Sequence, residues 1–292
     1  MKILSLSGVP RSLLEGIIKV CKLNPIKVIK KTFPDGEQYI RILDNSNKDV
    51  IVLQSLYPDQ DKKIIELYLA LEALRGIKAR IESLVIPYIA YSRQDKRFLE
   101  GEPISVKALY EPLKRVFNID TIVTVDVHSV TPFKDMGFNV INILPHTYMI
   151  SQINERIDII LAPDKGALNR AREVAQKYGI AYDFLEKYRD RITGQIRINE
   201  KELDVKDKVV AIVDDIVSTG STLAKAVEVL YRAGAKEVIA VVSHALLIGK
   251  AKELLEHSGL KLLVTSNSIE HKFDISWIRV VDISSLICNF IC

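Results

Sequence analysis

Short apolar runs rich in β-branched residues recur along the chain and alternate with segments of helical pattern. Each run has the length of a strand and is apolar throughout, which is typical of strands buried on both faces of a parallel sheet. The alternation predicts an α/β fold with doubly wound, mostly parallel sheets. The apolar runs lie at 1–6, 49–55, 81–88, 120–127, 158–164, 208–215 and 237–244, and the helical segments at 61–76, 105–118, 165–179 and 221–235.

Strand and helix units occur on both sides of position 145, in a chain of 292 residues. This length is nearer to two domains than to one. We therefore predict two tandem domains of similar architecture, 1–144 and 145–292, a pattern compatible with duplication. The final residues IRVVDISSLICNFIC are too apolar for a free tail, so we expect them to pack on a domain, the N-terminal one included, or on another subunit.

Charge and composition limit the kinds of binding partner that we expect for this chain. The chain has 41 basic and 37 acidic residues, a net charge of +4, without a block of like charges. We expect no nucleic-acid partner and at most a local basic pocket for a small anion. The cysteines Cys21, Cys288 and Cys292 form no CxxC pair and lie near no zinc-like histidine spacing, which favours a reduced, cytoplasmic protein. No segment resembles a signal peptide or a membrane span.

The segment VVAIVDDIVSTGST, residues 209–222, carries the strongest chemical signal. Asp214 and Asp215 fall at the predicted carboxyl end of a buried strand, and the small hydroxylic loop after them leads into a helix expected to begin near Thr222. Loop N–H groups and the positive end of a helix suit a phosphate, and carboxylates suit sugar hydroxyls. The alternative is a simple helix N-cap by Ser218 or Thr219. Two aspartates ending a buried strand favour the ligand site.

Four other segments have an ordinary structural interpretation beside a functional one. FPDG, 33–36, reads first as a turn, with an exposed Phe33 as its unusual part. The segment 91–97 reads as a solvated basic loop, and KYR, 187–189, as part of an exposed hairpin. In TVDVHS we expect Asp126 and His128 on one side of a strand, because alternate strand residues share a face, and a lone histidine there is more often a structural residue than a ligand.

A resemblance joins these segments. VVAIVDDIVSTGST resembles the phosphoribosyl-diphosphate signature of type I phosphoribosyltransferases and ribose-phosphate diphosphokinases. The resemblance implies that Asp214 and Asp215 meet the ribose hydroxyls. It implies that the 5-phosphate is held by the loop residues Ser218, Thr219, Gly220, Ser221 and Thr222, with Arg189 as a further ribose 5-phosphate contact.

The remaining segments resemble the diphosphokinases specifically, in the same order along nearly the whole chain. By this resemblance the ATP site holds Phe33, Asp35, Gly36, Glu37, Arg93, Gln94, Asp95 and His128. The metal ligands implied are His128 and Asp164, where Asp164 lies at a strand end in APDKG. Carboxylate oxygen suits Mg²⁺. Lys187 and Arg189 match a flexible catalytic loop and are the implied transition-state cations.

The resemblance implies a Mg²⁺-dependent ribose-phosphate diphosphokinase that makes 5-phosphoribosyl 1-diphosphate and AMP from ATP and ribose 5-phosphate. The family places the Phe33 segment at a neighbour's ATP, so we expect a homodimer or larger homo-oligomer with a shared ATP site. Two alternatives remain: a phosphoribosyltransferase that consumes the diphosphate, and a non-catalytic regulatory relative. FPDGE and SRQDKR argue against the first; the intact Lys187 and aspartate pair argue against the second.

Overall fold

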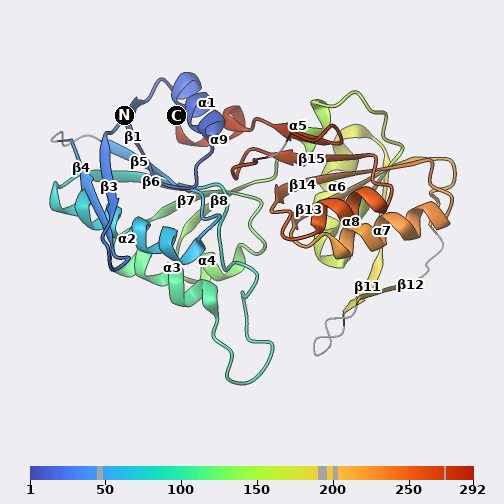
Figure 1. Ribbon diagram of the computed structural model, residues 1–292, viewed down its shortest axis with the longest axis horizontal. Helices are drawn as coiled ribbons and strands as arrows, with labels where there is room; N and C mark the ends of the chain where they lie inside the picture. The colour runs from blue at the N-terminus through green and yellow to red at the C-terminus, as the bar shows by residue number, and fades with distance from the viewer. Residues whose placement is uncertain (45–48, 190–195, 200–202, 273) are drawn as a thin grey trace. The chain divides into compact units, whose positions relative to one another are not determined.

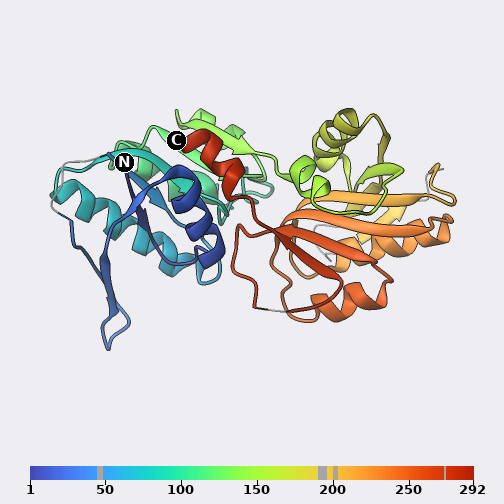
Figure 2. The same ribbon diagram turned by 90° about the horizontal axis from the view of Figure 1, so that it is seen from above.

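The computed structural model describes all residues except 45–48, 190–195, 200–202 and 273 (Figures 1 and 2). The chain forms two compact units. Unit 1 contains Met1–Ile143, Asn267–His271 and Asp282–Cys292, and unit 2 contains Leu144–Ser266 and Lys272–Val281. With the predicted ranges 1–144 and 145–292, the chain would pass from one domain to the other once. The observed chain instead returns to unit 1 twice, at Asn267 and at Asp282. The predicted domain ranges themselves stay a prediction.

Unit 1 is built on a six-stranded sheet in the order β2-β1-β5-β6-β7-β8, and each neighbouring pair is parallel. Its strands are β1 (Lys2–Ser5), β2 (Asn24–Pro25), β5 (Asp49–Leu53), β6 (Arg80–Ile86), β7 (Thr121–Val125) and β8 (Asn139–Ile143). Its helices are α1 (Arg11–Cys21), α2 (Gln60–Gly76), α3 (Ser105–Arg115), α4 (Thr131–Asp135) and α9 (Ser284–Ile291). Strands β3 (Val28–Thr32) and β4 (Gln38–Ile42) form a separate antiparallel hairpin.

Unit 2 repeats this plan, with the sheet order β10-β9-β13-β14-β15-β16 and parallel pairs throughout. Its strands are β9 (Ile159–Ala162), β10 (Ala181–Phe184), β13 (Val209–Val217), β14 (Glu237–Ala245), β15 (Leu262–Ser266) and β16 (Ile278–Val281). Its helices are α5 (His146–Ser151), the 3₁₀ turn η1 (Lys165–Ala167), α6 (Leu168–Tyr178), α7 (Ser221–Arg232) and α8 (Ala251–His257). The hairpin of β11 (Glu186–Arg189) and β12 (Ile196–Asn199) is antiparallel.

The sheet of unit 2 is covered on both faces, as the continuous apolar runs predict. Val210 and Ile212 of β13 pack with residues of α7 and α8. Ala211 and Val213, which alternate with them, pack with residues of α5 and α6. A strand with apolar neighbours on both sides has no polar face to present, which is why its sequence does not alternate. The predicted doubly wound α/β class is confirmed.

The two units also share the position of their hairpins. Counted within each unit, the large sheet has its second strand at one edge, then the first, then the third to the sixth. In both units an antiparallel hairpin lies between the second and third of these strands, β3–β4 in unit 1 and β11–β12 in unit 2. This common topology supports the duplication that the sequence pattern suggested. Among the described residues, no helix is both long and apolar enough to cross a membrane.

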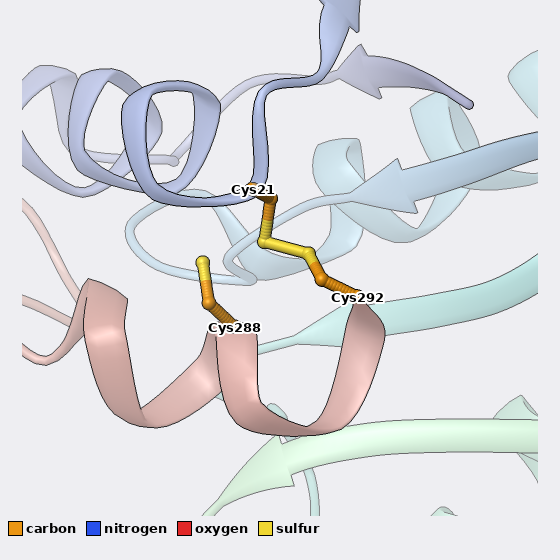
Figure 3. Close-up of side chains that lie close together, drawn as sticks. All are labelled: Cys21, Cys288 and Cys292. Atoms are coloured by element: carbon orange, nitrogen blue, oxygen red, sulfur yellow. A yellow bond between two sulfur atoms is a disulfide. The ribbon is translucent and has the colours of Figure 1, made fainter.

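Helices α1 and α9 bring the two ends of the chain together in unit 1 (Figure 1). They approach closely at Gly16, where an added Cβ would lie 2.4 Å from Ser284 Oγ. Cys21 and Cys292 form a disulfide across this contact, with Cα atoms 5.8 Å apart (Figure 3). The expectation of three reduced cysteines is therefore wrong for two of them. Their sequence separation of 271 residues hides the contact, since spacing patterns report only local cysteine sites.

We expect Cys292→Ser to lower the melting temperature. A disulfide that closes a long loop removes conformational freedom from the unfolded chain, typically about 3 kcal/mol, and this corresponds to about 6–12 °C for a unit of this size. Calorimetry in metal-free buffer checks this. A phosphine reductant should lower wild-type stability equally and leave the variant unaffected. Three titratable thiols in the denatured, unreduced wild type would contradict the disulfide.

Candidate functional site

The first candidate site lies in unit 2, where the strand order reverses between β9 and β13. Pairing of these strands ends at Leu161 with Ile212, whereas β13 continues to Val217 beside β14. Asp214 and Asp215 therefore lie inside β13 and not at its end, as the sequence had suggested. They lie beyond the last pair with β9, at the switch point where open α/β sheets bind ligands.

Electrostatics in this crevice favour a cation. Asp215 is buried and forms an ion pair with Arg170, 3.3 Å between Nη2 and Oδ2. Burial raises the pKa of Asp214 well above its usual range, and the charges of Asp215 and Asp164 raise it further, while Arg170 lowers it. The carboxyl groups of Asp164 and Asp215 thus act on Asp214 together with the guanidinium of Arg170. A cation bound in the crevice would favour the ionised form of Asp214.

Asp164 reaches the same crevice from the end of β9. Its Oδ1 accepts hydrogen bonds from the N–H groups of Gly166 at 2.9 Å and Ala167 at 3.3 Å, so it caps the short turn η1. These bonds fix the direction of the carboxyl group and leave its second oxygen outside the cap. Oxygen donors from carboxylates are the ligands that Mg²⁺ prefers in proteins. Asp164 therefore offers a carboxylate oxygen of the kind that magnesium prefers.

The loop after β13 forms the other wall of the site. Helix α7 begins at Ser221, one residue before the expected Thr222, and its N-cap is Gly220 with φ +77°. The N-cap position is thus held by Gly220 and not by Ser218 or Thr219, and a glycine has no side chain to accept from the first turn. The first N–H groups of a helix have no partner within it. The loop therefore offers backbone donors to an anion, as the ligand interpretation requires.

Gly220 and Ser218 show how the loop is held. An added Cβ at Gly220 would lie 3.3 Å from both Ala251 O and Leu255 Cγ, in a backbone conformation that favours glycine. The carbonyl of Ser218 accepts from the N–H of Ile248 at 2.9 Å. The hydroxyls of Thr219 and Ser221 lie 3.2 Å apart. The loop is thus fixed from the α8 side before any ligand arrives.

Sequence analysis missed a buried support beneath the aspartates. His146 Nε2 lies 2.9 Å from the carbonyl of Asp214 and 3.3 Å from Ser243 Oγ. Ser266 Oγ donates to the carbonyl of Ser243 at 2.6 Å. All three residues are buried. No motif surrounds His146 in the run LPHTYM, so only the fold reveals that it holds the backbone of Asp214.

A second group of predicted residues follows β6 in unit 1. The loop that carries Arg93, Gln94 and Asp95 projects from unit 1 in Figure 1. Arg93 is exposed, while Gln94 and Asp95 are partly buried. Gln94 Oε1 accepts from Ser105 Oγ at 2.6 Å, which ties the loop to the start of α3. Arg93 is left on a surface from which it can meet an anion.

The end of β7 differs from the prediction. The strand ends at Val125, and Asp126 follows with φ +43°. Asp126 is buried and His128 is exposed, so the expected shared face is wrong. Alternation applies only while the backbone stays extended, and the left-handed residue breaks it. His128 remains at the carboxyl edge of the unit 1 sheet, next along from the β6 loop.

The β3–β4 hairpin presents the third group. Its turn confirms the FPDG interpretation: the N–H of Gly36, with φ +97°, donates to the carbonyl of Phe33 at 2.9 Å. Phe33 is 44% exposed, and its ring contacts Tyr39 edge-on. Asp35 and Glu37 are exposed as well. An exposed aromatic ring at the tip of a hairpin that extends from its unit suits recognition (Figure 2).

The base of this hairpin is anchored to α2. Gln38 Nε2 donates to the carbonyl of Lys62 at 2.8 Å, and Lys30 Nζ lies 3.2 Å from Glu66 Oε1. Glu66 is buried and also accepts from Gln54 and from Ser7. Sequence analysis did not single out Glu66. Its contacts fix the direction in which Phe33 leaves the unit.

Lys187 and Arg189 lie on β11, paired with Ile198 and Ile196 of β12. The structure describes the backbone here; their side chains, and residues 190–195 that follow, lie outside the described part of the chain. The hairpin position of KYR agrees with its structural interpretation. The catalytic role of these two side chains stays a prediction.

Comparison with known proteins identifies both halves. Residues 1–116 match the N-terminal domain of ribose phosphate pyrophosphokinase, and residues 146–276 match the phosphoribosyl transferase domain. The ribose-phosphate pyrophosphokinase of Sulfurisphaera tokodaii is 40% identical over 94% of this chain and 95% of its own length. That of Pyrococcus furiosus is 41% identical over 87% of this chain and 90% of its own.

A solved structure agrees over the whole chain. The phosphoribosylpyrophosphate synthetase of Mycobacterium smegmatis superposes with a TM-score of 0.88 at 26% identity, covering 99% of this chain and 97% of that one. The similarity includes the unit that carries the Phe33 hairpin, which a phosphoribosyl transferase domain alone would not match. These findings confirm the resemblance seen in the sequence and the assignment as an enzyme. The chain belongs to the ribose-phosphate pyrophosphokinase family.

Proposed function

We propose that this enzyme uses ATP and ribose 5-phosphate as substrates and transfers the β,γ-diphosphoryl group to the 1-hydroxyl of the sugar. The products are 5-phosphoribosyl 1-diphosphate and AMP. The observation that carries this proposal is the switch-point crevice of unit 2. It combines Asp214 and Asp215 with a loop that leads into the first turn of α7, where backbone N–H groups can donate to an anion. A sugar phosphate needs both kinds of group, acceptors for hydroxyls and donors for phosphate.

In this proposal the loop residues Ser218 to Thr222 hold the 5-phosphate, and Asp214 and Asp215 accept from the ribose 2- and 3-hydroxyls. The ion pair with Arg170 keeps Asp215 in place. His146, which bonds to the carbonyl of Asp214, holds the backbone of β13 in position at this residue. The sugar is thereby oriented before the donor reacts. Such orientation lowers the activation barrier, because the entropy of bringing two reactants together is then lost on binding and not in the reaction step.

ATP is assigned to the unit 1 residues Arg93, Gln94, Asp95 and His128, together with Phe33, Asp35, Gly36 and Glu37 of a hairpin. The exposed Phe33 ring offers a stacking face for adenine. Magnesium, when bound with the nucleotide, neutralises phosphate charge. Asp164 and His128 are its proposed ligands.

The anomeric oxygen attacks the β-phosphorus, the bond from that phosphorus to the α-phosphate oxygen breaks, and AMP leaves. The hydroxyl proton passes to solvent or to a phosphate oxygen. Lys187 and Arg189 are the proposed cations that stabilise charge on the transferred group, because the transition state spreads negative charge over its oxygens. No covalent enzyme intermediate is required.

Incubation of the purified chain with ribose 5-phosphate, ATP and Mg²⁺ tests the proposal. We expect AMP to appear in step with phosphoribosyl diphosphate, measured by chromatography and phosphorus NMR. ADP in place of AMP would contradict diphosphoryl transfer. Consumption of added phosphoribosyl diphosphate with a free base would favour a transferase, and nucleotide binding without turnover would favour a regulatory relative.

The homodimer, or larger homo-oligomer, is also a proposal, as is the cytoplasmic setting. If Phe33 serves the neighbour's ATP site, Phe33→Ala should raise the KM for ATP by about 10–100-fold, the usual effect of losing a base-stacking ring.

A mixture of this variant with Lys187→Ala tests whether the ATP site is shared between subunits. One site of each mixed dimer would then be intact, so refolding the two together should restore about a quarter of wild-type activity. No recovery would contradict a shared site.

A further inference from the structure

The three cysteines form one cluster in unit 1, although the disulfide uses only two of them. Their sulfur atoms all lie within 4.8 Å of one another. Figure 3 shows the third, Cys288, pointing from α9 toward the bonded pair. Cys288 and Cys292 are four residues apart, and residues at this spacing share one face of a helix. Cys21 completes the group from the end of α1.

The cluster lies on a rigid framework that does not depend on the disulfide alone. The close contact of Gly16 with Ser284 sets the spacing of the two helices. Asp282, just before α9, accepts from Ser284 Oγ at 2.9 Å and from Asn267 Nδ2 at 2.8 Å. Opening the disulfide would therefore leave three thiols already close together. No large movement is needed to use them jointly.

Three converging thiols have the chemistry of a site for a thiophilic ion. Zn–S bonds of about 2.3 Å in tetrahedral geometry place sulfur atoms roughly 3.8 Å apart, within the spread of this cluster after the S–S bond opens. The Cα separation of 5.8 Å between Cys21 and Cys292 suits either state. Cys292 is exposed and Cys21 half-buried, so a fourth position is open to water.

We propose that, once a dithiol or phosphine reductant opens the Cys21–Cys292 disulfide, Cys21, Cys288 and Cys292 bind one Zn²⁺ as three thiolates. The reductant supplies two electrons and the disulfide becomes two thiols. Metal binding then releases three thiol protons. A two-electron thiol oxidant reverses the change by rejoining Cys21 and Cys292 and expelling the ion. Disulfide and metal are alternative states of one cluster.

In either state α9 stays linked to α1. The disulfide provides the link under oxidising conditions and the metal provides it under reducing ones, because structural zinc contributes its binding free energy to folding.

The test uses the whole chain, reduced with a phosphine and freed of reductant anaerobically, with excess Mg²⁺ present to occupy carboxylate sites. Co²⁺ replaces Zn²⁺ as the spectroscopic probe, and Zn²⁺ binding is measured by equilibrium dialysis. We expect one equivalent per chain with sulfur-to-cobalt charge-transfer absorption. The oxidised wild type, which has a single thiol, should show neither. Zn²⁺ should also raise the melting temperature of the reduced protein only.

Two variants separate the site from general folding. Cys288→Ser should keep the disulfide and its stability but weaken Zn²⁺ binding by the reduced chain at least about 100-fold, since even outer-shell changes cost about 10–100-fold. Cys292→Ser, at an exposed position, should neither form the disulfide nor bind Zn²⁺ in the reduced state. The proposal is overturned if reduced wild type binds no more metal than oxidised, or if the absorption survives in both variants.

Discussion

Lys187→Ala is expected to lower kcat by about a thousandfold and to leave the KM for ribose 5-phosphate nearly unchanged. A cation that meets the transferred group stabilises charge present mainly in the transition state, and such groups contribute about 10³-fold or more. A residue that acts in this way changes kcat without changing ground-state binding. Steady-state kinetics with quantified AMP provides the measurement.

The matched control for this change is Lys236→Ala. Lys236 is an exposed lysine of the same unit, at the turn before β14, and its backbone N–H donates to the carbonyl of Lys208 at 2.8 Å. Its removal changes the net charge equally and should leave kcat unaltered. Normal turnover of Lys187→Ala would remove this residue from the catalytic proposal, whereas equal losses in both variants would point to a general effect of charge.

Asp214→Asn is expected to have opposite effects on activity and stability. It should reduce kcat/KM about 100-fold, because the proposed acceptor for a sugar hydroxyl can then no longer carry a charge. It should also raise the melting temperature of the substrate-free protein at pH 7.5. The reason is the raised pKa of the buried Asp214 carboxyl, which means that ionisation of this group destabilises the folded state.

The pH dependence follows from the direction of that shift. A carboxyl whose pKa is higher in the folded than in the unfolded state contributes its full stability below the unfolded pKa, about 3.9, and loses it as pH rises through the folded pKa. The stability difference between Asp214→Asn and wild type should therefore shrink on acidification. Glu228→Gln, an exposed change on α7, should show no such trend. A lower melting temperature for Asp214→Asn at pH 7.5 would contradict this account.

The features that the sequence predicted well are those whose cause is local. Strands such as β13 and β14 are apolar throughout because they are buried on both faces, and this pattern is visible in the letters alone. The exposed strands β3 and β16 were not predicted. Four of the five residues of β3 and two of the four of β16 are exposed, because edge and hairpin strands need no continuous apolar run.

Errors arose where a backbone angle or a distant contact decides the outcome. The positive φ of Asp126 turns His128 away from its expected face, and the segment TVDVHS contains no glycine to announce it. The contact of Cys21 with Cys292 and the support of Asp214 by His146 join segments far apart in the chain. Propensity and spacing carry no information on such pairs.

The path of the chain has a consequence for its synthesis. Unit 1 receives its last helix, α9, from residues 284–291, after all of unit 2 has been made. Domains usually fold as they leave the ribosome, the N-terminal one first. Here unit 1 must wait, with the face of α1 near Gly16 uncovered, until unit 2 has emerged. Chains stopped short of α9 would therefore carry a complete unit 2 beside an unfinished unit 1, and chaperones and proteases would meet the N-terminal half first.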